Sequence, residues 1–280
     1  MGCAWNNGVP GRMWNWNQPF PPYRVIDNIY YVGSNQIAQF LITTPAGHIL
    51  LDSGFDASVP RLRANIARLG FRLEDVRVLL TSHAHIDHVQ AHARVRHLTG
   101  AQVVASALDA AVIASGGKGE ATFGDAFRWS PCPVDRIVAD GDEVTLGGTM
   151  LTAHLTPGHT RGAVTWTMKI ANPRSPPGRP LDVVFFPSAT INPGVTLVEN
   201  PRYPNIADDF ERSFAVWRSL PCDVFLADHG DFYDMREKRA RQERDSPVNP
   251  FIDPTGYREF IAASERRFRE VRAVQRSSAQ

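Results

Sequence analysis

The stretch Val78-Leu79-Leu80-Thr81-Ser82-His83-Ala84-His85-Ile86-Asp87-His88 determines how the rest of the chain is interpreted. Its first half is a short apolar run typical of a buried β-strand. Four side chains of metal-binding type follow within six residues. The strand fixes the start of the loop, so a compact turn can direct several side chains to one point. Because zinc binds imidazole nitrogens and carboxylate oxygens, the stretch predicts a zinc centre.

The residues of this motif fall into two pairs. His83 and His85 are two positions apart, so an extended backbone points both rings to the same side. Asp87 and His88 can then face a second metal nearby. The alternative is a polar loop whose histidines only form hydrogen bonds. One isolated histidine would favour that alternative, but His-x-His-x-Asp-His after a strand favours metal binding.

The surroundings of the other histidines separate them. His159, in TPGHT at 156–160, and His229, in ADHG at 227–230, each follow a predicted strand and adjoin a glycine, which favours a ligand. The histidines inside strands or on a helix are not expected to bind metal: His48, His92, His97 and His154. Asp52, in LLDSG at 50–54, ends another strand. It either begins a turn or accepts the N–H of a ligand imidazole and so fixes that ring.

Short β-branched segments bounded by glycine, proline or polar residues predict the strands of the chain. In the first half these are Ile29–Val32, Gln39–Thr43, His48–Asp52, Val76–Thr81 and Gln102–Ala105. In the second half they are Arg136–Val138, Glu143–Leu146, Thr149–Leu155, Ala163–Ile170, Val183–Phe186 and Val224–Ala227. The proline-rich segment Ala171–Pro180 is predicted to be a loop.

Helix patterns lie between and after these strands. Leu62, Ile66 and Leu69 recur at helical spacing, and Gly70 follows as a stop signal. Further helices are predicted between His88 and Gly100, over Ala107–Ala114, from Ile206 to Trp217 and from Tyr257 to Phe268. Strands mixed with helices in both halves indicate packed sheets with helices on the outer faces.

Four motifs, taken in order, resemble the metallo-β-lactamase superfamily: LLDSG at 50–54, SHAHIDH at 82–88, TPGHT at 156–160 and ADHG at 227–230. The resemblance extends from about Pro19 to the C-terminus. It implies an α/β fold, the αβ/βα four-layer sandwich, with two mixed β-sheets and helices on the outer faces. It also divides the chain into an N-terminal extension, 1–18, and a single domain, 19–280.

The segment after the predicted strand Val183–Phe186 is more specific. Glyoxalase-type hydrolases and many lactonases of the superfamily carry a metal-bridging aspartate there, and lactamases of the first subclass carry a cysteine. This chain has Pro187-Ser188-Ala189-Thr190, with neither a carboxylate nor a thiol. That pattern, with NPRYP at 200–204 and LPCDV at 220–224, is similar to the third subclass of class B β-lactamases.

The resemblance implies a role for each site residue. The first zinc would be held by His83, His85 and His159, and the second by Asp87, His88 and His229. Asp87 would also orient the attacking water, and Ser188 and Thr190 would bind the substrate carboxylate. Phe123, with Trp14 or Trp16, would form the apolar walls of the site, although ordinary packing is an equal alternative for Phe123.

The implied activity is zinc-dependent hydrolysis of the β-lactam amide bond of penicillins, cephalosporins and carbapenems by a metal-bound hydroxide. One alternative is another hydrolase of the superfamily, such as a lactonase, and a second is a non-catalytic metal-binding or scaffold protein. The stretch Val89-Gln90-Ala91-His92 leaves lactonase activity as an alternative, because the subclass usually has a small Ala-Gly-Gly stretch there. The expected partner is a small-molecule β-lactam.

Composition limits the remaining classes. The net charge of +1 favours neither nucleic acid nor a membrane surface, and we expect a monomer. Exported family members imply a periplasmic or secreted protein, while the lack of a signal-peptide pattern keeps a cytoplasmic location as the alternative. The cysteines Cys3, Cys132 and Cys222 leave the disulfide state open. Because residues 223–280 contain no cysteine, Cys222 is not expected to pair with that segment.

Overall fold

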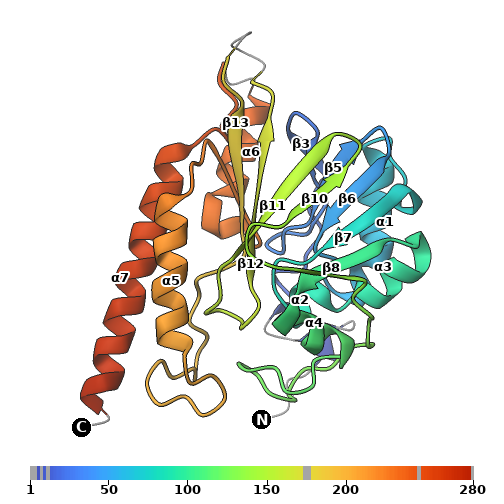
Figure 1. The fold of residues 1–280 in the computed structure, drawn as a ribbon. Coiled ribbons are helices and arrows are strands. Elements are labelled where there is room, and N and C mark those ends of the chain that lie inside the picture. The colour runs from blue at the N-terminus through green and yellow to red at the C-terminus, as the bar shows by residue number, and fades with distance from the viewer. Residues whose placement is uncertain (1–4, 7–8, 11–12, 173–177, 245–246, 279–280) are drawn as a thin grey trace.

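The computed structural model describes residues 5–6, 9–10, 13–172, 178–244 and 247–278 (Figure 1). One sheet contains β3 (Tyr23–Ile26), β4 (Ile29–Tyr31), β5 (Phe40–Thr44), β6 (Gly47–Leu51), β7 (Val76–Leu80), β8 (Gln102–Ser106) and β9 (Arg136–Val138), in that order. The other contains β10 (Glu143–Leu146), β11 (Thr149–Leu155), β12 (Val164–Ile170), β13 (Leu181–Phe186) and β14 (Val224–Ala227). The short strands β1 (Trp5–Asn6) and β2 (Val9–Pro10) pair with each other.

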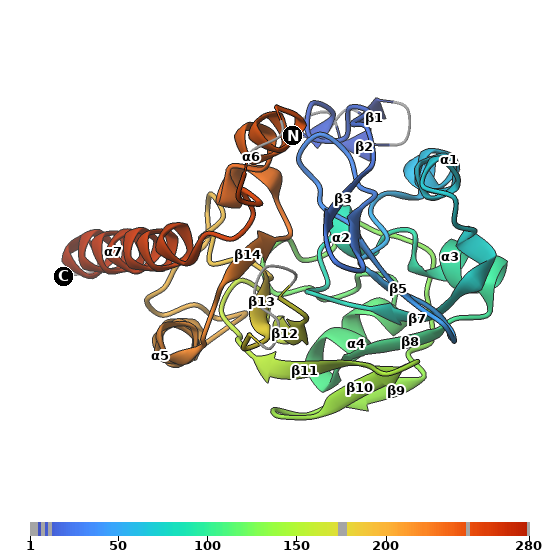
Figure 2. The same ribbon diagram turned by 90° about the horizontal axis from the view of Figure 1, so that it is seen from above.

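The helices lie outside the two sheets. They are α1 (Val59–Arg68), α2 (Ile86–Val89), α3 (His92–Thr99), α4 (Ala107–Ala114), α5 (Ile206–Ser219), α6 (Met235–Glu243) and α7 (Pro254–Ser278). Figures 1 and 2 show the sheets face to face, with α1 and α3 outside the first sheet and α5 and α7 outside the second. The predicted four-layer sandwich is therefore confirmed. No described helix combines the length and apolarity needed to cross a membrane.

Two hydrophobic clusters explain these layers. Residues of β5 to β8 that face outward, such as Leu79, pack against Leu62 and Ile66 of α1 and Val95 of α3. Residues that face inward belong to the larger cluster shared with the second sheet. Its Trp166 is fully buried, and the ring N–H donates to the Thr81 carbonyl at 2.9 Å. This bond ties the second sheet to the end of β7, immediately before the histidine motif.

The strand ends position the site. β6 to β9 are mutually parallel, so β7 is covered on both faces and carries an almost continuous apolar sequence. β13 and β14 are also parallel. Loops that follow the carboxyl ends of parallel strands lie at one edge of a sheet, where ligands usually bind in α/β proteins. The loops after β7, β13 and β14 carry predicted site residues.

All of the predicted strands agree with the structure to within two residues, whereas β1, β2, β3, α2 and α6 were not predicted. The division at residue 18 stays a prediction, although Met13 is buried against Ile37 and Phe55. Residues 173–177 of the predicted loop, and Cys3, lie outside the described residues. Cys132 and Cys222 are free thiols.

Candidate metal centre

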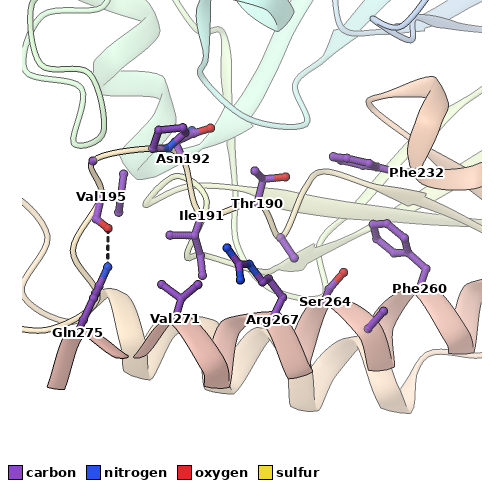
Figure 3. Close-up of a pocket in the computed structure, with 14 residues that line it drawn as sticks. Thr190, Ile191, Asn192, Val195, Phe232, Phe260, Ser264, Arg267, Val271 and Gln275 are labelled. Carbon is purple, nitrogen blue, oxygen red and sulfur yellow. Dashed lines mark hydrogen bonds between the residues drawn. The ribbon is translucent and has the colours of Figure 1, made fainter. Parts of the chain in front are cut away.

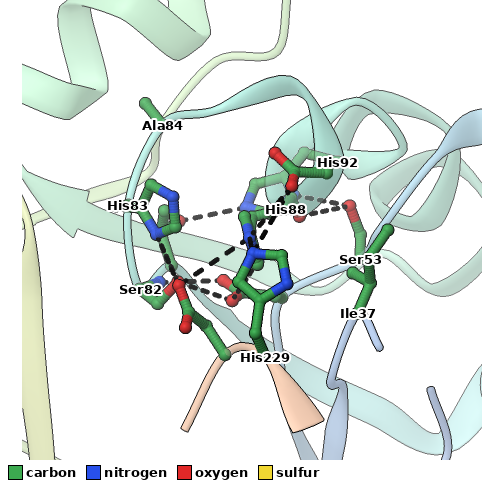
Figure 4. Close-up of polar contacts among 12 residues, drawn as sticks. Ile37, Ser53, Ser82, His83, Ala84, His88, His92 and His229 are labelled. Carbon is green, nitrogen blue, oxygen red and sulfur yellow. Dashed lines mark hydrogen bonds and ion pairs between the residues drawn. The ribbon is translucent and has the colours of Figure 1, made fainter. Parts of the chain in front are cut away.

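The structure brings all six predicted ligands together. His83 and His85 follow β7, Asp87 and His88 lie in α2, His159 follows β11, and His229 follows β14. Figure 4 shows the rings of His83, His88 and His229 converging from these elements. All six side chains are buried or nearly so. They form two triples, each with its donor atoms within 4.8 Å of one another.

The triple of Asp87, His88 and His229 has the spacing of ligands around one ion. Asp87 Oδ2 lies 3.6 Å from the Nε2 atoms of both histidines, and these two nitrogens are 3.3 Å apart. Ligand atoms placed tetrahedrally about 2.1 Å from a zinc ion lie about 3.4 Å from one another. The donor atoms present therefore fit a zinc ion without rearrangement.

In the triple of His83, His85 and His159, hydrogen bonds on one ring nitrogen leave the other for a metal. His159 Nδ1 donates to the Thr190 carbonyl at 2.7 Å, so Nε2 keeps its lone pair. His83 Nδ1 lies 3.1 Å from Ser82 Oγ, while His83 Nε2 is buried without a hydrogen-bond partner among the described residues. An unpaired buried polar atom is costly, and a bound metal would satisfy it.

A glycine is required beside His159. Gly158 has φ +140°, and a Cβ at this position would lie 2.7 Å from the ring of Phe210. Any larger residue would therefore displace either the loop or the Phe210 side chain of α5. The glycine that marked His159 in the sequence thus has a packing reason.

Asp52 lies directly behind His88. Its Oδ2 is 3.2 Å from His88 Nδ1, and its carboxylate accepts bonds from the Ser82 amide at 2.8 Å and the Ser82 hydroxyl at 2.6 Å. Asp52 also has φ +61°, a backbone region that aspartate visits more readily than most residues. Both sequence interpretations therefore describe features of this residue, a tight turn and a carboxylate against the imidazole.

Three of the six ligand-type side chains, the imidazoles of His83, His159 and His229, favour the neutral form that binds a cation. Burial lowers the pKa of His83 and His159 well below the usual value, and the pKa of His229 to about 4. Burial also opposes the charged form of His88, but nearby carboxylates, Asp87 first, raise its pKa to about 9. Burial acts to raise the pKa of Asp87, but the charges of His88 and His229 outweigh it and lower that pKa. A metal would displace a proton from His88.

Three buried carboxylates near the cluster were not predicted from the sequence. Asp228 Oδ2 lies 3.4 Å from His83 Nδ1 and 3.8 Å from His88 Nε2, and burial raises the pKa of this carboxyl group. With these two histidines it forms an alternative triple of possible ligands. Its position beside His229 in the ADHG motif was a signal that could have identified it.

Asp109 joins the two loops of the first triple. Its Oδ2 accepts from the Ala84 amide at 2.7 Å and the Thr160 hydroxyl at 3.0 Å, and its Oδ1 accepts from the Gly162 amide at 3.0 Å. Burial raises the pKa of Asp109 to about 6. The third carboxylate, Glu120, lies beside His85.

The histidines not expected to bind metal belong to no such triple among the described residues. The His92 ring is not free to bind a metal, because both of its nitrogens make hydrogen bonds. Nδ1 lies 2.7 Å from Ser53 Oγ, and Nε2 lies 3.0 Å from Thr81 Oγ1. The ring supports the loops behind the site (Figure 4).

A pocket of about 380 Å³ opens onto the cluster. It is lined by His85, Asp87, His159 and His229 together with Met13, Trp16, Gln36, Phe123, Ser188, Thr190, Asn192, Pro193, Asp231 and Phe232. The sequence analysis gave Trp14 or Trp16 as a wall residue, and Trp16 is the one that lines the pocket. The ring centroids of Trp16 and His229 are 5.2 Å apart. The Phe123 ring lies 5.1 Å from the His85 ring. Ser188, which is 1% exposed, accepts the Thr190 amide at 3.1 Å.

A second groove, of about 500 Å³, lies between the 189–195 loop and α7 (Figure 3). None of the six predicted ligands lines it. The Gln275 side chain crosses from α7 to this loop, donating to the Val195 carbonyl at 3.0 Å and accepting the Leu197 amide at 2.6 Å. The loop that carries Thr190 is therefore tied to α7 at Val195 and Leu197.

Comparison with known proteins places this geometry in a family. The family model described as "Metallo-beta-lactamase superfamily" matches residues 32–169. Among curated proteins, a probable metallo-hydrolase of Burkholderia pseudomallei is 34% identical over 41% of this chain and 38% of its own length. A hydroxyacylglutathione hydrolase of Fuscovulum blasticum is 31% identical over 36% of this chain and 31% of its own length. The chain thus matches less than half the length of these curated relatives.

Solved structures are similar over nearly their whole length. The native metallo-β-lactamase of Legionella gormanii is 40% identical, with a TM-score of 0.89, over 93% of this chain and 98% of that chain. A subclass B3 metallo-β-lactamase of Bradyrhizobium japonicum is 36% identical, with a TM-score of 0.88, over 96% and 99%. A Cronobacter sakazakii metallo-β-lactamase with a HARLDQ motif is 38% identical, with a TM-score of 0.89, over 95% and 99%.

Proposed function

This chain belongs to the metallo-β-lactamase superfamily of hydrolases, and we propose that it is a zinc-dependent β-lactamase of the third subclass. One observation carries the proposal. Beside the two histidine triples, the loop after β13 presents the hydroxyl residues Ser188 and Thr190 to the pocket, where many lactonases of the superfamily carry a bridging carboxylate. The similarity of this chain to solved β-lactamases over more than nine-tenths of its length supports the same conclusion.

We assign the first zinc to His83, His85 and His159, and the second to Asp87, His88 and His229. The buried unpaired Nε2 of His83 and the spacing of the second triple support this assignment. The relative from Cronobacter sakazakii is described by a HARLDQ motif, whereas the corresponding six-residue motif in this chain, HAHIDH at 83–88, has imidazoles at its third and sixth positions. Asp52 would hold the His88 ring with Nε2 toward the metal.

The pocket residues suggest how the substrate is handled. Bound zinc would lower the pKa of a water toward about 7 and polarise the lactam carbonyl. Asp87 orients the nucleophile and passes a proton to the leaving nitrogen. The Ser188 and Thr190 hydroxyls donate to the carboxylate next to the ring nitrogen. Phe123 and Trp16 cover the apolar parts of the substrate and exclude water.

The Val89-Gln90-Ala91-His92 departure does not narrow this pocket. Val89 and Ala91 pack in the core outside the first sheet, and none of the four residues lines the pocket.

The contacts of the described residues do not favour hydrolysis of the β-lactam through a serine nucleophile. Ser115 and Lys118 have the Ser-x-x-Lys spacing, but the Ser115 hydroxyl donates to the Val112 carbonyl at 3.1 Å and Lys118 is exposed.

The alternative function is hydrolysis of lactones or other esters. The hydroxyacylglutathione hydrolase among the sequence relatives supports this alternative. By resemblance to the exported family, we also infer a periplasmic or secreted monomer that acts on small molecules.

Hydrolysis of a carbapenem and a penicillin, with and without a chelator, tests the proposal. We expect turnover that is lost with the chelator and restored by zinc, with about two zinc ions bound per chain. His159→Ala should lose zinc, whereas the exposed control His97→Ala should not. Turnover of lactones but of no β-lactam by the zinc-loaded protein would replace this function with the alternative.

A further inference from the structure

Glu120 is a buried carboxylate in the loop after α4, only 5% exposed. Its Oε1 accepts the Thr122 amide at 2.8 Å, and its Oε2 accepts the Phe123 amide at 2.6 Å. The chain closes on itself here, because the Gly124 amide donates to the Glu120 carbonyl at 2.8 Å. The carboxylate is therefore held in a fixed orientation by the backbone of its own loop.

This carboxylate faces one nitrogen of His85. Oε1 lies 3.5 Å from His85 Nε2, which is buried and has no closer hydrogen-bond partner among the described residues. A shift of about half an ångström would bring the two atoms to ordinary hydrogen-bond length. A neutral imidazole has one N–H and one lone pair, so a proton held on Nε2 leaves Nδ1 as the metal-binding atom.

Glu120 itself is not placed as a ligand. It belongs to none of the groups of His, Cys, Asp and Glu side chains in the described parts of the chain that could surround an ion. The contacts instead give it two neighbours in the pocket, the His85 ring and the backbone of Phe123. One carboxylate therefore contacts both a predicted ligand and a residue of the pocket wall, whose ring centroids are 5.1 Å apart.

We propose that Glu120 is a positioning residue that accepts the Nε2–H of His85, orients Nδ1 toward the first metal and fixes Phe123 at the pocket wall. The inference rests on the proposed role of His83, His85 and His159 as ligands. It predicts that the loss of one side chain weakens the first metal site and also impairs substrate binding.

The test uses Glu120→Ala and Glu120→Gln in the full chain, with Asp125→Asn as the matched control. Asp125 is a carboxylate of the same loop that also accepts a backbone amide, that of Gly119 at 3.2 Å, but its side chain is 69% exposed. Zinc affinity is measured by competition with a chromophoric chelator, the first site is monitored by the visible spectrum of the cobalt-substituted protein, and unfolding of the metal-free protein is followed by heating.

Loss of such a carboxylate partner typically weakens metal binding by about 10- to 100-fold. We expect a loss of that size at one of two sites for Glu120→Ala, an altered cobalt spectrum, a raised KM and a smaller effect for Glu120→Gln, which keeps an acceptor oxygen. Asp125→Asn should match the wild type. A residue with only a structural role would lower the melting temperature without changing zinc affinity.

The outcomes separate this inference from the proposed function. Wild-type zinc affinity in both Glu120 variants would overturn the inference and leave the function standing. If Glu120→Ala fails to fold, the affinity and spectrum of Glu120→Gln decide, and wild-type values there would overturn the inference. A wild-type protein that takes up no zinc would overturn the proposed function and the inference with it.

Discussion

Replacing Asp109 by asparagine tests how the loops of the first metal site are held together. Asp109 uses two oxygens to accept three buried donors, the Ala84 amide, the Thr160 hydroxyl and the Gly162 amide. Asparagine keeps one oxygen, so at least one donor faces an NH₂ group and loses its acceptor whichever way the amide turns. Each stranded buried donor costs about 1–3 kcal/mol. We expect the free energy of unfolding of the metal-free protein to fall by at least about 1–3 kcal/mol, since one donor or more is stranded.

In a protein of this size each kilocalorie corresponds to roughly 2–4 °C in the melting temperature, so the change is measurable by circular dichroism. The same variant should bind its first zinc more weakly, because His83 and His85 are no longer tied to the loop of His159. Asp125→Asn is again the control. An Asp109→Asn protein with the melting temperature and zinc affinity of the wild type would show that this carboxylate does not hold the loops together.

Three further substitutions test other parts of the account. Thr190→Ala should lower kcat/KM for a penicillin by about ten- to a hundredfold, the cost of about 1.5–3 kcal/mol for a lost bond to a charged group. Zinc content should not change, since the backbone carbonyl that orients His159 remains, and a fall in zinc by elemental analysis would contradict the assignment. Gln275→Ala releases the loop that carries Thr190 and should raise KM by up to roughly tenfold with little change in kcat, because two modest hydrogen bonds are lost; unchanged KM would argue against a role for α7. Asp253→Ala removes the carboxylate that lies 2.8 Å from the buried Lys238 ammonium. The free energy of unfolding measured in urea should fall by about 3 kcal/mol. This is the low end for a buried ion pair, because the Asp253 side chain is 29% exposed. Burial acts to raise the pKa of Asp253, but the bonds from Lys238 and the Gly256 amide, together with the charges of Lys238 and Arg241, outweigh it and lower that pKa. This stabilisation is therefore present above the usual aspartate pKa and is lost as pH falls through the lowered value; a pair whose contribution grew on acidification would contradict it.

The residues that the structure brings together could be predicted from the sequence where their signal is local. Four ligand-type residues directly after an apolar strand, and a histidine beside glycine at two other strand ends, needed no knowledge of the fold. The structure adds that Gly158 is required by the packing of Phe210. The contact of Asp52 with His88 was left open, since no spacing fixes which way a strand-end carboxylate turns.

The supporting carboxylates could not be predicted in the same way. Asp109 is 25 residues from Ala84 and 53 from Gly162, so only the packing of α4 against both loops brings them together. Glu120 meets His85 across a similar gap in the sequence. Helix α6 was missed for another reason. Only Met235 and Lys238 of its nine residues are buried, so the apolar periodicity that marks a helix is absent.

Zinc-edge anomalous diffraction from crystals grown with zinc locates the bound metal ions and so tests the proposed ligand sets. We predict two peaks per chain, one among His83, His85 and His159 and the other among Asp87, His88 and His229. A single peak held by His83, His88 and Asp228, the alternative triple in the structure, would contradict the assignment.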